Sequence, residues 1–134
     1  MVEMQLSRIV IRESSDHQTI FLREKGGMRQ FRILIGLFEA IAIDRRVRER
    51  QTARPMTHDL MANVVRSLGA ELEKVVVSEL RDNTFYARLV VRRPGDDEPI
   101  EIDARPSDAI ALATHLDAPI FVAEEVLDAV VTDD

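Results

Sequence analysis

The sequence contains no cysteine, and this absence removes several classes of site at once. A disulfide framework, a zinc–thiolate site and a thiol nucleophile are all excluded. Aromatic rings are also scarce, with five phenylalanines, one tyrosine and no tryptophan. This scarcity argues against a stacking platform for single-stranded nucleic acid, because such a platform requires exposed rings.

Long apolar runs are missing as well. The apolar runs fall far short of the roughly 18 residues of a membrane-spanning helix. The first residues, MVEMQ, lack the basic and then apolar order of a signal peptide. We therefore expect no membrane association and a cytoplasmic location.

An excess of positive charge is the next feature that the chain lacks. It has 18 basic and 24 acidic residues, a formal net charge of −6, so the overall basic character of many nucleic-acid-binding proteins is missing. One segment, Asp44 to Arg54, runs against this balance, because its arginines outnumber its acidic residues. Two interpretations stay open: a solvated helix end, where arginine favours the helix dipole, and a surface that binds nucleic-acid phosphates.

The length of 134 residues predicts one compact domain over residues 1–134. Hydrophobic periodicity predicts helices over about 37–47, 58–68, 107–116 and 124–131. Alternating and β-branched runs predict strands over 2–12, 19–22, 29–35, 71–80, 84–93, 99–104 and 120–122. This order is typical of an α+β domain with a mostly antiparallel sheet and three to four packed helices. In the strand over 99–104 we expect Ile100, Ile102 and Ala104 to point inward.

A short pattern occurs twice, at residues 54–60 (RPMTHDL) and 105–110 (RPSDAI). Each copy reads Arg-Pro, a hydroxyl residue, an aspartate and an apolar helix. Thr57 and Ser107 are expected to cap their helices, and an aspartate in the first turn complements the helix dipole. Capping alone does not require the arginines, so Arg54 and Arg105 could equally bind an aspartate or a phosphate through two hydrogen bonds.

Glu39 is the only charged residue between Arg32 and Asp44, in a segment expected to be buried. A buried carboxylate has to be paired, hydrogen-bonded or bound to metal. One interpretation is a capping box at the start of its own helix. The other is a metal or nucleic-acid site formed by Glu39, Asp59 and Asp108, with Mg²⁺ or Mn²⁺ as the ion that suits carboxylate and water ligands.

Three histidines are present, and His58 stands out because it lies beside Asp59 in the first repeated pattern. It could act as a general base, or it could be a partly exposed residue in the first turn of a helix. His17 falls in an expected loop, and His115 falls near a helix C-terminus, where a cation is favoured in any case. No Walker loop, dinucleotide-binding glycine motif or metalloprotease motif is present.

Four segments together resemble the signature blocks of the bifunctional nuclease family: residues 35–43 (IGLFEAIAI), 54–60, 84–89 (TFYARL) and 103–113 (DARPSDAIALA). The similarity covers roughly residues 3–131. It implies a compact α+β fold, assembly into a homodimer or larger, and degradation of DNA and RNA. The signature positions that it transfers to this chain are Glu39, Arg54, Thr57, His58, Asp59, Arg105, Ser107 and Asp108.

The leading hypothesis is therefore a nuclease that hydrolyses phosphodiester bonds with the help of a metal ion. Glu39, Asp59 and Asp108 would hold the ion, with His58 as a further catalytic candidate. Arg54 and Arg105 would bind phosphate oxygens, together with Thr57 and Ser107 at the helix starts. Two alternatives remain: a non-catalytic regulatory or assembly domain, and a module that binds a small anion at the helix N-termini.

Overall fold

The computed structural model describes residues 1–12, 14–50 and 52–130. Its sheet consists of two antiparallel three-stranded meanders joined by one short strand. The first meander comprises β1 (Val2–Val10), β2 (Gln18–Glu24) and β3 (Gln30–Ile35), and the second comprises β4 (Glu71–Arg81), β5 (Thr84–Arg92) and β6 (Ile100–Ala104). Strand β7 (Ile120–Val122) lies between β1 and β4, antiparallel to the former and parallel to the latter. The resulting order is β3-β2-β1-β7-β4-β5-β6.

Tight turns hold the meanders together, and the sharpest joins β4 to β5. Its two central residues, Asp82 and Asn83, both have positive φ values, 52° and 60°. Such a pair is typical of the type I′ turn, whose twist matches that of the flanking strands. Asp and Asn tolerate this conformation better than most residues, which explains the turn at this point of the sequence.

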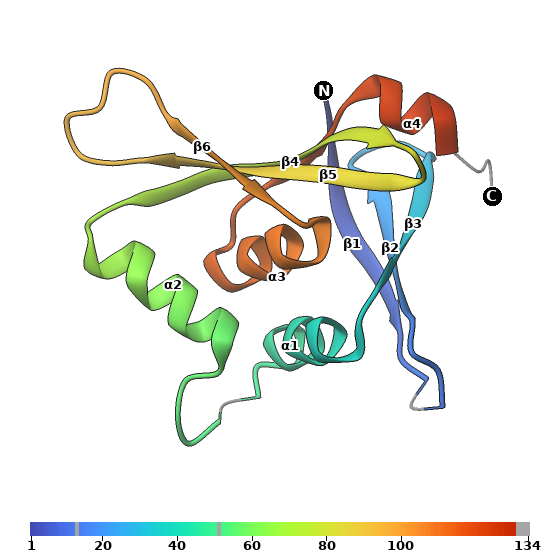
Figure 1. The fold of residues 1–134 in the computed structure, drawn as a ribbon, viewed down its shortest axis with the longest axis horizontal. Helices are drawn as coiled ribbons and strands as arrows, with labels where there is room; N and C mark the ends of the chain where they lie inside the picture. Colours follow the sequence, from blue (N-terminus) through green and yellow to red (C-terminus); the bar gives the residue numbers. More distant parts are fainter. Residues whose placement is uncertain (13, 51, 131–134) are drawn as a thin grey trace.

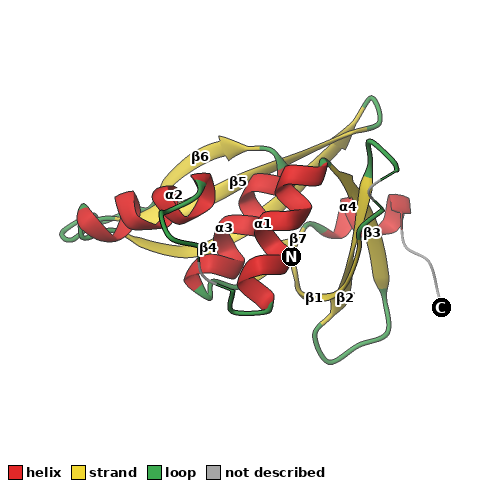
Figure 2. Cartoon of the chain, turned by 90° about the horizontal axis from the view of Figure 1, so that it is seen from below, coloured by secondary structure: helices red, strands yellow, loops and turns green. Residues whose placement is uncertain are grey.

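Three helices cover one face of the sheet: α1 (Leu37–Val47), α2 (Thr57–Ser67) and α3 (Pro106–Leu116). Figure 1 shows the short helix α4 (Glu124–Val130) on the other side of the β4–β5 ribbon. Helix α3 is the central one of the three, as Figure 2 shows. It contacts both α1 and α2 as well as β4 and β5.

The core lies between α3 and the sheet. Small residues let α3 approach closely, and Ala109, Ile110, Ala111, Leu112 and Ala113 are all at most 1% exposed. Apolar side chains from both meanders meet them, so one continuous core joins the two halves of the sheet. Because contacts with two helices and two strands fix the position of α3, the polar residues at its two ends have defined positions.

The structure confirms the α+β class and nearly all expected elements, with two corrections. Helices α2 and α3 begin at Thr57 and Pro106, so Met56 and Arg105 occupy the N-cap positions expected for Thr57 and Ser107. Ile100 and Ile102 were expected to be buried, but they are 36% and 44% exposed. Strand β6 is one edge of the sheet, and these residues pair with Val91 and Leu89 of β5 while the other side of β6 has no neighbouring strand within the described ranges. The expected end of the last helix, residue 131, lies outside the described residues.

None of the helices in the described part of the chain is long and apolar enough to cross a membrane.

Candidate active site

The N-terminal ends of α1, α2 and α3 lie close together, and a row of side chains with alternating charge connects them. Arg105 donates from Nη2 to Oε1 of Glu39 on α1, at 2.9 Å, and from Nε to Oδ2 of Asp108 in its own first turn, also at 2.9 Å. The other oxygen of Asp108 lies 3.0 Å from Nε2 of His58 on α2. Four of the signature residues therefore form one connected chain, Glu39–Arg105–Asp108–His58.

A second histidine–aspartate pair joins α2 and α3, this time with the aspartate on α2 and the histidine on α3. Oδ1 of Asp59, on α2, lies 2.9 Å from Nε2 of His115, which is in the last turn of α3. The other oxygen of Asp59 accepts a hydrogen bond from the backbone N–H of Met56 at 2.9 Å and so caps α2. The two imidazole rings lie side by side, with centroids 6.2 Å apart. Each histidine is thus held by an aspartate from the other helix.

Both aspartates are stabilised as carboxylates. The hydrogen bond from the Met56 N–H is the largest influence that lowers the pKa of Asp59, and His115 and Arg45 add to it. Burial raises the pKa of Asp108, but hydrogen bonds from Arg105 and His58, together with their charges, outweigh it and leave the pKa below its ordinary value. Both side chains therefore accept hydrogen bonds, and the histidine Nε2 atoms beside them act as donors.

The two histidines differ in their second ring nitrogen. Nδ1 of His115 lies 2.8 Å from the carbonyl oxygen of Ala111. A carbonyl and a carboxylate both accept, so His115 forms both bonds only when both of its nitrogens carry a proton. Nδ1 of His58 has no hydrogen-bond partner among the described residues. With Nε2–H directed at Asp108, the neutral ring of His58 carries its lone pair on that open nitrogen.

His58, Asp59 and His115 line a cavity of about 560 Å³ beside the C-terminal half of α1. Arg45, Arg46 and Arg50 also line it. None of the three guanidinium groups makes an ion pair or hydrogen bond within the described residues. The charge of Arg45 does contribute to the lowered pKa of Asp59. Besides Asp59, the acidic residue in the cavity wall is Glu49. The cavity thus combines arginines, which suit an anionic ligand, with a histidine whose Nδ1 has no hydrogen-bond partner among the described residues.

The backbone at the end of α1 keeps these arginines together. The N–H of Arg50 donates to the carbonyl of Arg45, and the N–H of Glu49 donates to the carbonyl of Arg46. This is the Schellman arrangement, with Glu49 in the left-handed position at φ 56°. The turn folds Arg50 back toward the last turn of the helix, so the local basic segment of the sequence becomes one wall of the cavity.

The remaining signature residues lie apart from this cavity wall. Arg54 and Thr57 are exposed, and the Arg54 side chain has no partner among the described residues. Ser107 is 7% exposed and lines a different cavity of about 710 Å³, together with Arg32 and Arg105. The structure therefore brings together Glu39, His58, Arg105 and Asp108, and it places Asp59 in the neighbouring pair.

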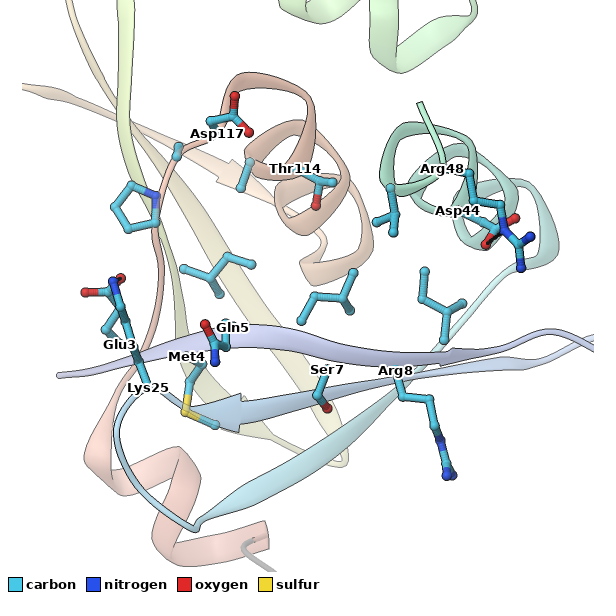
Figure 3. A pocket seen from close by; sticks show the side chains of 17 residues that line it. Glu3, Met4, Gln5, Ser7, Arg8, Lys25, Asp44, Arg48, Thr114 and Asp117 are labelled. Carbon is cyan, nitrogen blue, oxygen red and sulfur yellow. Dashed lines mark hydrogen bonds and ion pairs between the residues drawn. The ribbon is translucent and has the colours of Figure 1, made fainter. Parts of the chain in front are cut away.

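A larger cavity, about 720 Å³, lies between β1 and the ends of α1 and α3 (Figure 3). Its charges are mostly neutralised: Lys25 pairs with Glu3 at 3.3 Å, and Arg48 pairs with Asp44 at 3.0 Å. Figure 3 shows the Arg8 side chain pointing away from the helices, and its guanidinium lies over the ring of Phe21. Size alone therefore does not identify the site, whereas the unpaired arginines of the smaller cavity do.

His115 is the residue that sequence reasoning missed. It is 56 positions away from Asp59 in the chain, and its place at a helix C-terminus had an adequate local explanation. The sequence does contain one signal, since two histidines and two aspartates occur at the ends of helices that pack on each other. Only the packing of α2 on α3 shows that they pair crosswise.

The three carboxylates expected to hold a metal ion point to different partners. Asp59 faces His115, Asp108 faces His58 and Arg105, and Glu39 faces Arg105. Within the described residues, no three His, Asp or Glu side chains are grouped as metal ligands. The arrangement as it stands does not fit a cation held by these three residues.

Known proteins resemble this chain over nearly its whole length. A protein of Mycobacterium tuberculosis described as uncharacterized is 36% identical over 127 residues, which is 95% of this chain and 74% of that protein. "Bifunctional nuclease 1" of Oryza sativa subsp. indica is 26% identical over 87% of this chain, and "Bifunctional nuclease 2" of Oryza sativa subsp. japonica is 29% identical over 84%. The chain spans only 36% and 35% of these two rice proteins.

The profile of the bifunctional nuclease domain matches residues 20–133. This range includes both repeated Arg-Pro patterns, the crossed histidine–aspartate pairs and the arginine-lined cavity. The chain therefore belongs to the bifunctional nuclease domain family.

Proposed function

We propose that the protein is a nuclease that hydrolyses phosphodiester bonds of DNA and RNA in the cavity lined by Arg45, Arg46, Arg50 and His58. One observation carries the proposal: a histidine held by a carboxylate keeps an open nitrogen in a cavity with three unpaired guanidinium groups. Family membership and the names of the rice relatives support the same reaction class.

In the proposed reaction, the arginines bind the non-bridging oxygens of a phosphodiester and neutralise the charge that develops on them. Nδ1 of His58 takes a proton from a water molecule, whose oxygen then attacks the phosphorus. The bond from phosphorus to the leaving sugar oxygen breaks, and that oxygen takes a proton from solvent water, while the proton on His58 returns to solvent. The products are a phosphomonoester and an alcohol. Because water is the nucleophile, the reaction needs no ribose 2′-hydroxyl and applies to DNA as well as RNA.

Asp108 is a positioning residue in this scheme. It fixes the His58 ring with Nε2–H toward itself and stabilises the imidazolium that forms when Nδ1 takes a proton. Arg105 and Glu39 keep Asp108 in place from the other side. His115 already uses both nitrogens, so we assign it a structural role beside the phosphate site.

A divalent cation, Mg²⁺ or Mn²⁺, stays a prediction from the sequence. The direct test is a cleavage assay on highly purified protein, with and without EDTA, for wild type and His58→Ala. We expect cleavage by the wild type and a loss of about 10²–10⁴-fold in the variant. Equal rates for the two proteins would contradict the role of His58, and loss of cleavage in EDTA would add a metal ion to the mechanism.

We also propose that the protein self-associates. Leu60, Val64 and Leu68 follow one another along α2 and are 56%, 48% and 72% exposed. Exposed apolar stripes of this kind are typical of protein interfaces. Light scattering at micromolar concentration is expected to give at least the mass of a dimer, and Leu60→Glu is expected to lower it. A monomer mass at every concentration would contradict the proposal.

A further inference from the structure

One aromatic ring stands out because almost nothing covers it. Phe38, in the first turn of α1, is 83% exposed, which makes it the most exposed of the large apolar residues that the structure describes. The scarcity of rings in the sequence argued against a stacking surface, but a single ring in the right place is enough to stack one base. An apolar ring left in water on this scale indicates a binding role more strongly than an exposed aliphatic side chain does.

Helical spacing places this ring in line with the cavity. Phe38, Ala42 and Arg45 follow one another at intervals of four and three residues and so share one face of α1. The last two of them line the cavity that holds His58. Phe38 therefore lies on the same helix face, about one turn beyond the cavity wall.

An arginine also lies at the N-terminal end of α1. Glu39, the residue after Phe38, is paired with Arg105, whose side chain remains 66% exposed. Arg105 and Gly36 line the neighbouring cavity, together with the exposed residue Arg32. Along the chain, Phe38 thus follows Gly36, which lines one arginine-bearing cavity, and precedes Ala42, which lines the other.

Nucleic acid is the ligand whose chemistry matches this order of groups. Its phosphates suit the arginines of the two cavities, and the flat face of a base suits the exposed ring. In a duplex the base faces are already stacked on their neighbours, and extrusion of a base costs a few kcal/mol. An unpaired base meets the ring without that cost.

We infer that Phe38 stacks on an unpaired base, so that the substrate of the proposed nuclease is single-stranded nucleic acid. This inference rests on the proposed function, since it requires that the strand lies along the arginine-lined cavity. It names the strandedness of the substrate, which the reaction scheme leaves open.

The absence of tryptophan makes a direct test available. Phe38→Trp in a His58→Ala background introduces the only indole of a protein that does not cut its ligand. We expect oligothymidylate to quench the indole fluorescence by stacking, and a blunt DNA duplex of the same length to quench it much less. Met28→Trp in the same background, at a position 68% exposed in the turn between β2 and β3, is the matched control and is expected to stay unquenched.

Affinity gives a second readout. Phe38→Ala is expected to weaken the binding of labelled oligothymidylate about 5- to 100-fold, whereas Phe38→Tyr keeps the ring and the affinity. Binding without a selective quench, or with unchanged affinity in Phe38→Ala, would overturn the stacking role and leave the proposed nuclease intact. Absence of all nucleic-acid binding would overturn both. A fall in the light-scattering mass on Phe38→Ala, without any change in oligonucleotide affinity, would assign the ring to the interface with a second copy and also overturn the inference.

Discussion

The two histidine–aspartate pairs between α2 and α3 share their distances and differ in what surrounds them. His58 lies 3.0 Å from Asp108 and His115 lies 2.9 Å from Asp59. Behind the first pair, Asp108 is held by Arg105, and within the described residues the far nitrogen of His58 is open. In the second pair, Asp59 caps a helix and the far nitrogen of His115 is bound to a backbone carbonyl. A pair with satisfied groups on both sides therefore builds the scaffold, while a pair with one open nitrogen can react.

Replacement of each aspartate by asparagine is expected to separate the two pairs most strongly. Asp108→Asn keeps one oxygen for Arg105 and turns its amide NH₂ toward His58, which reverses the His58 tautomer and removes the charge that stabilises the imidazolium. We expect the cleavage rate to fall by about 10²–10⁴-fold. Asp59→Asn keeps an oxygen for the Met56 N–H, and we expect the rate to change less than about tenfold. Steady-state cleavage of one oligonucleotide by both variants is the measurement. Similar reductions in the two would show that the pairs do not differ as described.

The arginines of the cavity are expected to control affinity rather than the protonation chemistry. Replacement of Arg45, Arg46 and Arg50 by serine is expected to weaken binding of unrelated sequences alike. It should also flatten the salt dependence of binding, by roughly one unit of slope for each phosphate that an arginine no longer neutralises. Arg48→Ser is the matched control, because Arg48 is already paired with Asp44 and faces another cavity. An unchanged slope in the triple variant would assign these arginines to a solvated helix end.

Acid is expected to weaken both pairs through their carboxyl groups. The folded-state pKa values of Asp59 and Asp108 both lie below the ordinary value, so their stabilisation is present above about pH 4 and is lost as the pH falls through the folded pKa values. Urea unfolding between neutral and acid pH is expected to show a shallower decline for the variant with both aspartates replaced by asparagine than for the wild type. Parallel curves would mean that the two carboxyl groups contribute no pH-dependent stability.

The smallest expected effect concerns the turn that folds Arg50 back. Glu49 is a non-glycine residue in the left-handed region of φ. Glu49→Gly relieves the steric strain of this conformation, although it also raises the conformational entropy of the unfolded chain. We expect the free energy of unfolding to rise by up to about 1 kcal/mol, as measured by thermal denaturation, with the cleavage rate little changed. Gly69 ends α2 in the same conformation, at φ 71°, so Gly69→Ala provides the opposite change for comparison. A destabilised Glu49→Gly variant would show that the glutamate side chain itself supports the turn.

Most of the fold could be predicted because its signals are local. The periodicity of residues 37–47 gives α1 its observed bounds, Gly69 marks the end of α2, and Asp82-Asn83 marks the turn between β4 and β5. The caps were misplaced because the hydroxyl residues suggested an N-cap at Thr57, whereas Asp59 supplies the oxygen from inside the helix. Glu49 and Asp117 end their helices in the left-handed region, and neither position carries the glycine that usually predicts such an end.

The site could be predicted in its residue types but not in its pairing. The sequence indicated Glu39, His58, Asp59, Arg105, Asp108 and the arginine segment as candidates. The interactions that define the site join residues 50, 56 and 66 positions apart, and no local pattern encodes them.

Chemical rescue by imidazole tests whether Nδ1 of His58 is the base that takes the proton from water. His58→Ala and His115→Ala are each assayed for cleavage of an oligonucleotide over a series of imidazole concentrations. If the open nitrogen of His58 takes the proton from water, added imidazole restores cleavage in His58→Ala, because it can occupy the space that the ring leaves and act as the base. It has little effect on His115→Ala, which loses a structural residue rather than a base. Rescue of His115→Ala alone, or full activity of His58→Ala without imidazole, would contradict the account.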